Sequence, residues 1–222
     1  MIQKTNRILI FAFPIILALT LTWNSTAMCE VIHEAVKNNN LPEVRRLIEN
    51  DPNLVFSKDE NGFTPLHLAA ANGYRGMVDF LLTTKADVNA RDDSGSTPLH
   101  QAAAAEGEHS DTVEVLLAHK ANVDAADQQG LTPLHYALLA DNPDVALTLL
   151  RHGANPNVKD NKVGHTPLIL AASKGYKQVT ELLLAHGADV NAADNRGTPL
   201  AWAIRTDHAN VADLLRQHGG HE

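Results

Sequence analysis

The chain has 222 residues, of which 26 are acidic and 18 are lysine or arginine, so its formal net charge is −8. An acidic surface repels polyanions, and no basic patch with interleaved aromatic residues occurs, so the composition argues against nucleic acid as a partner. A single cysteine excludes an intramolecular disulfide framework and a cysteine-ligated zinc site.

Residues 1–27 have the layout of a secretory signal peptide. Lys4 and Arg7 precede an apolar run from Ile8 to Trp23, and Ser25 and Ala27 then occupy the −3 and −1 positions of a cleavage site. We expect cleavage after Ala27 and export, either to a periplasm or by secretion. The alternative is an uncleaved membrane anchor, but this proline-interrupted run is shorter than the ~20 residues that cross a bilayer comfortably. Removal of the leader leaves 16 basic and 26 acidic residues, a net charge of −10.

Cys29 lies where a bacterial lipoprotein signal would place its acylated cysteine, at the end of Thr26-Ala27-Met28-Cys29. Met28 stands where that signal prefers a small residue, so we interpret Cys29 as an ordinary thiol. Lipid attachment at Cys29 is the alternative, and it would make the protein a membrane-tethered envelope lipoprotein with a structural or protective role. Contact with a membrane is expected only through the leader or through such a lipid.

Residues 30–58 are expected to cap an array at its N-terminal end. The polar run Lys37-Asn38-Asn39-Asn40 predicts a turn, and Pro42 to Ile48 predicts an amphipathic helix. Ile32-His33-Glu34-Ala35 is a degenerate copy of a motif that recurs later in the chain. This first copy lacks the Thr-Pro pair with which the later copies begin. Such a copy suits a terminal unit, which must face water on one side.

The motif itself begins at Gly62-Phe63-Thr64-Pro65-Leu66-His67, and its Thr-Pro-Leu core recurs almost to the C-terminus. Threonine is a good helix N-cap, and proline fits the first helical position. A period of about 34 residues indicates an array of stacked supersecondary units in place of one globular core. The cores begin at Thr64, Thr97, Thr132, Thr166 and Thr198.

The segment Gly62 to Ala70, followed by Leu81-Leu82 and Ala86 to Ala90, resembles the ankyrin repeat almost residue for residue. With the leader, this suggests an exported ankyrin-repeat protein of bacterial type. The resemblance implies an all-α solenoid of stacked helix-turn-helix units with β-hairpin-like loops. It divides the chain into an N-terminal cap at 30–58, repeats at 59–91, 92–126, 127–159 and 160–193, and a C-terminal cap at 194–222.

Departures from the repeat frame predict where loops change length. Two extra residues are expected between the helices near Glu106 to Ser110 and one extra residue in a hairpin near Val163, and the last hairpin is one residue short. Lys85 and Lys120 stand where Gly153 and Gly187 follow the second helices, at a position that usually adopts a left-handed conformation.

The repeated apolar pairs are expected to form the core. Leucine pairs lie on the second helices with helical spacing, and small alanine pairs let the first helices approach closely. The leucine pairs begin at Leu81, Leu116, Leu149, Leu183 and Leu214, and the alanine pairs begin at Ala69, Ala102 and Ala171.

Most of the twelve histidines recur in fixed places of the repeat. His67, His100 and His135 follow Thr-Pro-Leu, where the family uses the imidazole to hydrogen-bond the turn that starts the helix. Another set, His119, His152 and His186, stands at the ends of second helices, where a cationic imidazole is favourable. Stacked helices are roughly 8–10 Å apart, too far for these rings to share a metal. No metal or cofactor is expected.

Sequence motifs of catalysis are missing from the chain. It contains no glycine-rich phosphate loop, no Gly-x-Ser-x-Gly and no His-Glu-x-x-His. Paired acids such as Asp92-Asp93 recur at hairpin tips, where turn chemistry accounts for them. We therefore expect no catalytic residue and no enzyme activity.

The expected function is non-catalytic protein binding by a monomeric scaffold. The family places its contacts on the concave side, on the hairpin tips and the exposed face of the inner helices. Phe63 and Leu131 are the two apolar side chains among the variable tip positions, either as anchors for a partner or as local packing. The expected partner-binding residues are Glu60, Asn61, Phe63, Asp93, Ser94, Ser96, Gln128, Gln129, Leu131, Asn161, Lys162 and His165.

Overall fold

The computed structural model describes residues 27–105, 107 and 109–222. Residues 27–37 form the first helix of this part and pair with α2 (Leu41–Asn50), after which comes a short 3-10 helix, η1 (Pro52–Phe56). Five further helix pairs follow. They are α3 (Pro65–Ala71) with α4 (Arg75–Thr83), α5 (Pro98–Ala104) with α6 (Ser110–Ala118), α7 (Pro133–Leu139) with α8 (Pro143–Arg151), α9 (Pro167–Lys174) with α10 (Lys177–Ala185), and α11 (Pro199–Arg205) with α12 (Ala209–Gln217).

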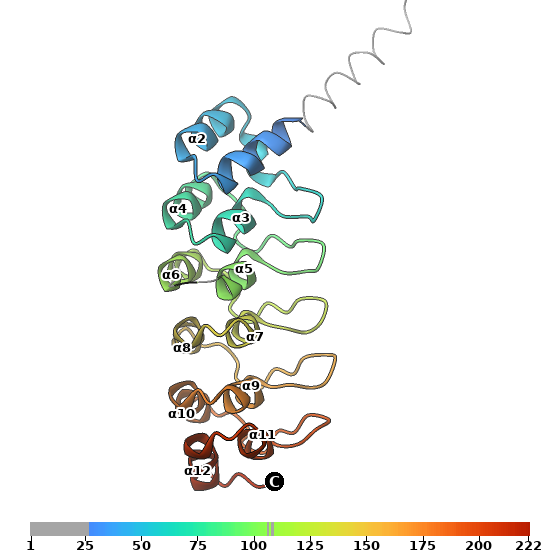
Figure 1. Cartoon of the computed structure of the whole chain (residues 1–222). Helices are drawn as coiled ribbons and strands as arrows, with labels where there is room; N and C mark the ends of the chain where they lie inside the picture. Colours follow the sequence, from blue (N-terminus) through green and yellow to red (C-terminus); the bar gives the residue numbers. More distant parts are fainter. Residues whose placement is uncertain (1–26, 106, 108) are drawn as a thin grey trace, which may run out of the picture.

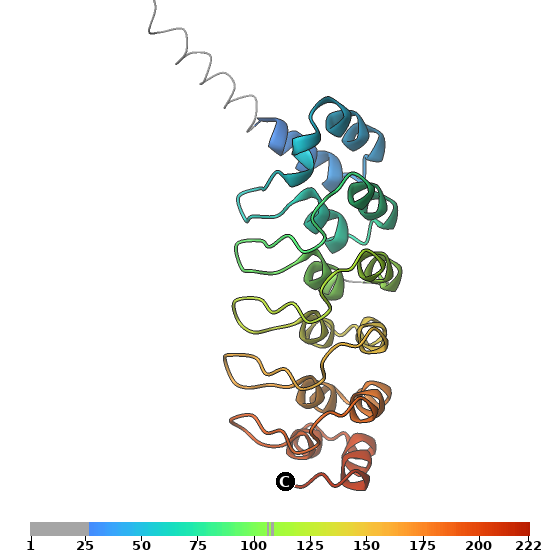
Figure 2. The ribbon, with the colours of Figure 1, turned by 180° about the vertical axis from the view of Figure 1, so that it is seen from behind.

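The pairs stack into an elongated array (Figure 1). The odd-numbered helices α3 to α11 form an inner column, the even-numbered helices α4 to α12 form an outer column, and the hairpin loops form a third column beside the inner one, as the opposite view also shows (Figure 2). Each helix of the inner column packs on the next one. The described residues contain no strand, only an isolated bridge between Asp194 and Gly197. The expected all-α solenoid is therefore confirmed.

The inner helices begin as the Thr-Pro-Leu-His motif predicts. Thr64 is the N-cap of α3, and its backbone N–H and hydroxyl lie 3.1 and 2.8 Å from Nδ1 of His67. Because Nδ1 accepts from a backbone N–H, the ring hydrogen lies on Nε2, which donates to the carbonyl of Ser96 at 3.2 Å. His100 and His135 repeat both contacts. The structural interpretation of these histidines is confirmed, and each ring also joins its repeat to the next.

The core is the continuous apolar layer between the two helix columns. The alanine pairs of α3, α5 and α9 are fully buried, and the first leucine of every pair on the outer helices is buried as expected. Small side chains on the inner helices let their backbones approach, while the leucines fill the space behind them. His119, His152 and His186 are the C-caps of α6, α8 and α10.

The predicted changes in loop length are found at their expected places. In the ordinary hairpin the backbone N–H of Asp127 donates to the carbonyl of Leu131, four positions later. The same bond joins Asp160 to His165, one position further, and Asp194 to Gly197, one position nearer. The two-residue insertion falls between α5 and α6. Lys85 and Lys120 have φ angles of 71° and 68°, so both lysines adopt the left-handed conformation.

Candidate partner-binding face

Each hairpin is organised by the aspartate that begins it. Oδ1 of Asp127 accepts the backbone N–H groups of Gln129 at 2.8 Å and Leu131 at 2.9 Å. The expected turn chemistry is confirmed. Because the carboxylate satisfies the backbone from within, the other tip side chains are free to face outward. Equivalent bonds to Oδ1 hold the tips that begin at Asp59, Asp92, Asp160 and Asp194.

Neighbouring hairpins are also joined to each other. One backbone N–H at each tip donates to a carbonyl of the preceding tip, which aligns the loops as one column (Figure 2). The exposed surface of the tips, together with the exposed side of the inner helices, is called the hairpin face below. The four bonds are Asp93 to Asn61 at 3.1 Å, Gln128 to Ser94 at 3.0 Å, Asn161 to Gln129 at 2.8 Å and Asn195 to Val163 at 3.3 Å.

Eight of the twelve expected partner-binding residues are exposed on this face. They come from four successive hairpins, so the stacking brings side chains about 33 residues apart in the sequence into one surface. The exposed residues are Glu60, Asn61, Asp93, Ser94, Gln128, Gln129, Asn161 and Lys162.

Ser96 does not share this exposure. It is 1% exposed, and its hydroxyl lies 2.9 Å from the hydroxyl of Tyr136, which itself donates to Oδ2 of Asp127 at 3.0 Å. Burial, together with the Asp127 carboxylate, raises the pKa of Tyr136, although the bond with Ser96 acts in the opposite direction. Ser96 therefore supports the neighbouring inner helix and presents almost no surface to a partner.

Phe63, Leu131 and His165 are partly buried, each in a different way. The ring of Phe63 stacks on His67 with centroids 5.7 Å apart and packs against the core. The imidazole of His165 lies 3.1 Å from Oδ2 of Asp194, edge-on to Trp202. Leu131 and His165 both line a hollow in the hairpin face.

Four residues of that hollow were not among the expected contacts: Leu139, Asp160, Val163 and Arg196. Leu139 ends α7 and is 47% exposed. The corresponding seventh position after the motif threonine holds Ala71, Ala104 and Ser173 in other repeats, so the large apolar residue at this slot was the sequence signal for this site.

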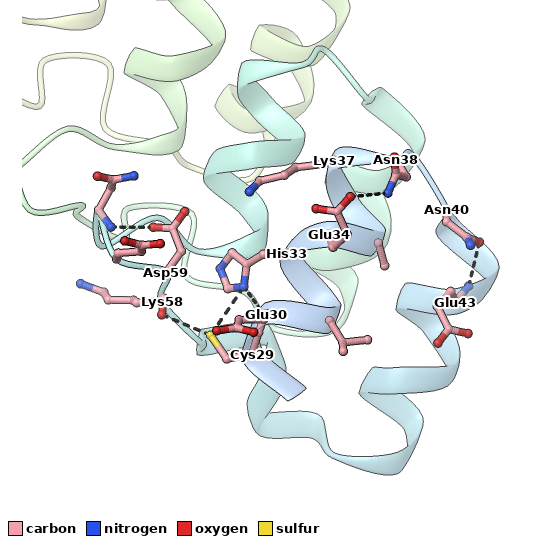
Figure 3. A pocket seen from close by; sticks show the side chains of 14 residues that line it. Cys29, Glu30, His33, Glu34, Lys37, Asn38, Asn40, Glu43, Lys58 and Asp59 are labelled. Carbon is pink, nitrogen blue, oxygen red and sulfur yellow. Dashed lines mark hydrogen bonds between the residues drawn. The ribbon is translucent and has the colours of Figure 1, made fainter. Parts of the chain in front are cut away.

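A second hollow of about 980 Å³ lies beside the first helix, at Cys29, His33 and Lys58 (Figure 3). The Cys29 thiol lies 3.2 Å from the carbonyl of Lys58 and 3.6 Å from Nδ1 of His33. Nδ1 also lies 2.6 Å from the carbonyl of Cys29, and Nε2 lies 2.8 Å from the carbonyl of Phe63. A neutral imidazole carries one ring hydrogen and so donates to only one of these carbonyls. The thiol donates to the carbonyl of Lys58, and its contact with Nδ1 is the longer one, so the pair is not arranged as a thiol and its base.

Two further properties of the described part of the chain bear on other functions. No group of three or more histidine, cysteine, aspartate or glutamate side chains in it is arranged to hold a metal ion. None of the helices described has the length and hydropathy of a membrane span. The signal-peptide prediction falls on residues 1–26, which lie outside the described residues, apart from Ala27 at the expected cleavage position.

Family models for ankyrin repeats match residues 47–102, 85–160 and 158–222. The chain belongs to the ankyrin-repeat family. The matches span both helix columns and the hairpins, so this ankyrin-repeat chain owes its hairpin face to the family's architecture and the hollow at Leu139 to its own side chains.

Curated relatives share short stretches of ankyrin repeats. Delta-latroinsectotoxin-Lt1a from Latrodectus tredecimguttatus is 46% identical over 57 residues, which is 26% of this chain and 5% of the toxin. A putative ankyrin repeat protein of fowlpox virus is 47% identical over 57 residues, 25% of this chain and 13% of that protein. Protein phosphatase 1 regulatory subunit 27 of Mus musculus is 37% identical over 59 residues, 27% of this chain and 38% of the subunit.

The ankyrin-repeat chain thus aligns with only a small part of each relative's length. The relatives are spider, viral and mouse proteins, and they lend no support to a bacterial source. What they share with the chain is a repeat family that generally serves as an interaction scaffold.

Proposed function

We propose that this ankyrin-repeat protein is an exported, monomeric, non-catalytic scaffold that binds a protein partner through its hairpin face. The observation that carries the proposal is the hairpin column itself. Its backbone is bonded within and between tips, and exposed side chains from four hairpins share one surface. The backbone of each tip is already fixed by its own hydrogen bonds, and this suits recognition, because little conformational freedom of the loop is lost when a partner binds.

Export rests on the leader pattern of residues 1–27 and is tested by the intact mass of the protein recovered from its source. We expect a chain that begins at Met28 and carries no lipid. A species that retains Ile8 to Trp23 would contradict cleavage. A species that begins at a diacylated Cys29 would favour the alternative of a membrane-tethered lipoprotein.

The binding face is tested by placing one photo-crosslinking amino acid at Gln129 or Lys162 on the hairpin tips. The matched controls carry it at Glu114 or Gln178, which are exposed on the outer helices α6 and α10. We expect a discrete crosslinked partner from the hairpin positions only. Crosslinks confined to Glu114 and Gln178 would show that the partner binds the outer helices.

A further inference from the structure

The hollow in the hairpin face combines an apolar floor with a cationic rim. It has a volume of about 370 Å³ and lies between the hairpins at 127–131 and 160–165 and the end of α7. Leu131, Leu139 and Val163 supply its apolar lining, called the floor below, and the exposed cations Lys162 and Arg196 are called its rim. The remaining lining residues are Gln129, Asp160 and His165.

Leu139 contributes nothing to the core, and almost half of its surface faces water. Leu131 and Val163 are also partly exposed, so three apolar side chains from two hairpins and one inner helix meet at one open place. A lone exposed leucine is ordinary, but an apolar cluster within a polar surround is the usual form of an anchor pocket.

The carboxylates next to the hollow are already engaged. The side chain of Asp160 is 6% exposed, and the backbone N–H groups of Lys162 and Val163 each donate to it at 2.8 Å. Burial would raise the pKa of Asp160, but the backbone donors from residues 162–165 outweigh it and keep that pKa low. Asp194 is fully buried at its side chain, where it receives Nε1 of Trp202 at 2.9 Å.

The two cations at the rim, unlike these buried carboxylates, are open to solvent. Lys162 and Arg196 are exposed and form no ion pair within the described part of the chain. A third cation, Arg205, lies over the ring of Trp202 at 3.9 Å, and its Nη1 donates to the carbonyl of Arg196 at 3.3 Å. Residues 28–222 carry a net charge of −10, and here three cations gather beside two aspartates whose side chains are buried.

We propose that the hollow binds an extended segment of a partner protein in which an aliphatic or aromatic side chain stands next to aspartate or glutamate. The apolar side chain covers Leu131, Leu139 and Val163, and the carboxylate pairs with Lys162 or Arg196. This inference rests on the proposed function and specifies the chemistry of the partner.

The probe is a phage-displayed library of random peptides, selected on the immobilised full chain. We expect enrichment of peptides that combine an acid with a neighbouring large apolar residue. For an enriched peptide made synthetically, Lys162→Glu/Arg196→Glu should weaken binding about tenfold or more, and Leu139→Ala about fivefold. Both changes lie at exposed positions and leave the core intact. The charge-matched control Lys120→Glu/Arg151→Glu, at the ends of outer helices, should change affinity less than about twofold.

Enrichment of neutral or basic peptides, or no enrichment at all, would overturn the acidic-segment inference. Acidic peptides that bind the variants at Lys162, Arg196 and Leu139 as tightly as they bind the unchanged protein would also overturn it. If such peptides lose affinity when Asn61 or Ser94 is changed, the hairpin face still binds protein and only the assignment to this hollow falls. Crosslinks confined to the outer helices would instead remove the proposed function.

Discussion

Asn157 Nδ2 donates a hydrogen bond to the carbonyl oxygen of Gly187, 2.9 Å away and one repeat further along the chain. Its Oδ1 accepts the backbone N–H of Asp189 at 2.8 Å, so one side-chain amide binds the following turn twice. Asn89 and Asn191 make the same pair of contacts. This arrangement ties successive repeats together on the surface, away from the hairpins.

Asp124 stands in the same place in its repeat, and its Oδ1 accepts the N–H of Asn155 at 2.8 Å. A carboxylate has no hydrogen to donate, so the second bond, to the carbonyl of Gly153, is missing. We expect Asp124→Asn to supply it and to raise the free energy of unfolding by about 0.5–1 kcal/mol in urea melts at neutral pH. The reciprocal control, Asn157→Asp, should lower it by a similar amount. Loss of stability in Asp124→Asn would refute the role assigned to the amide.

The left-handed lysines give a second prediction. Lys85 and Lys120 hold φ angles near 70°, where a side chain is strained and glycine is not. Lys85→Gly or Lys120→Gly should therefore raise stability, by about 1 kcal/mol at most, because glycine also gains freedom in the unfolded chain. Gly153→Lys, at the equivalent position with φ 85°, should do the opposite. Urea midpoints that fall in both lysine-to-glycine variants would contradict this reasoning.

Buried histidines make stability depend on pH. Burial lowers the pKa of His67, His100 and His135 below the ordinary value of 6.5. Between the lowered pKa and 6.5 the unfolded chain binds more protons than the folded one, so their contribution to stability is full above about pH 7 and is lost as pH falls below 6.5. Three protons give a slope of at most about 4 kcal/mol per pH unit.

The slope is measured from unfolding free energies at a series of pH values. The repeat at 160–193 carries Ile169 where three other repeats carry His67, His100 and His135, so His100→Ile follows a substitution that the array already accommodates. That variant is less stable at every pH, but the slope below pH 6.5 should fall by about one third, since one of three protons is removed. An unchanged slope would show that these rings do not titrate on unfolding.

A row of cations before the hairpin aspartates gives the fourth prediction. Lys58 Nζ donates to the carbonyl of Arg91 at 2.7 Å, Arg91 Nη1 to that of Ala126 at 2.9 Å, and Lys159 Nζ to that of Ala193 at 3.0 Å. Ala126 interrupts the row. Ala126→Lys should let Nζ reach the carbonyl of Lys159 and add about 0.5 kcal/mol.

The control for Ala126→Lys is Lys159→Ala, which removes one bond of the same kind and should reduce stability by a similar amount. A general effect of adding positive charge to an acidic protein would disappear in about 1 M NaCl, where the Debye length is about 3 Å. A gain that vanishes in this salt would therefore point to charge alone and not to the new bond.

The repeat frame explains how much of this structure could be read from the sequence. Every repeat offers the same positions for comparison within one chain. This comparison gave the role of His67, the left-handed conformation of Lys85 and the extra residue in the hairpin that begins at Asp160. Ser96 was misplaced because its burial depends on Tyr136, which belongs to the next repeat. The frame fixes a residue's position within its own repeat, but not the size of the side chain that covers it.

The hollow at Leu139 escaped prediction for the same reason. Its floor is assembled from the end of one inner helix and two hairpins, and its rim includes Arg196 from a third. Only the stacking of the repeats brings these residues together. A scan of exposed slots for unusually large apolar residues would have singled out Leu139, but not the cations beside it.

The hairpin column is held by one backbone hydrogen bond at each step, whereas the helix columns share a continuous apolar core. That bond and side-chain contacts such as the one from Gln128 Nε2 to the carbonyl of Asp93 are a small restraint compared with that packing. When the array bends, the spacing between stacked helices should therefore change least, and the spacing between neighbouring hairpin tips should change most. A partner that binds several tips at once would fix the spacing between them and so the curvature of the whole array. The distance between the first and last hairpins would then differ between the free and the bound protein.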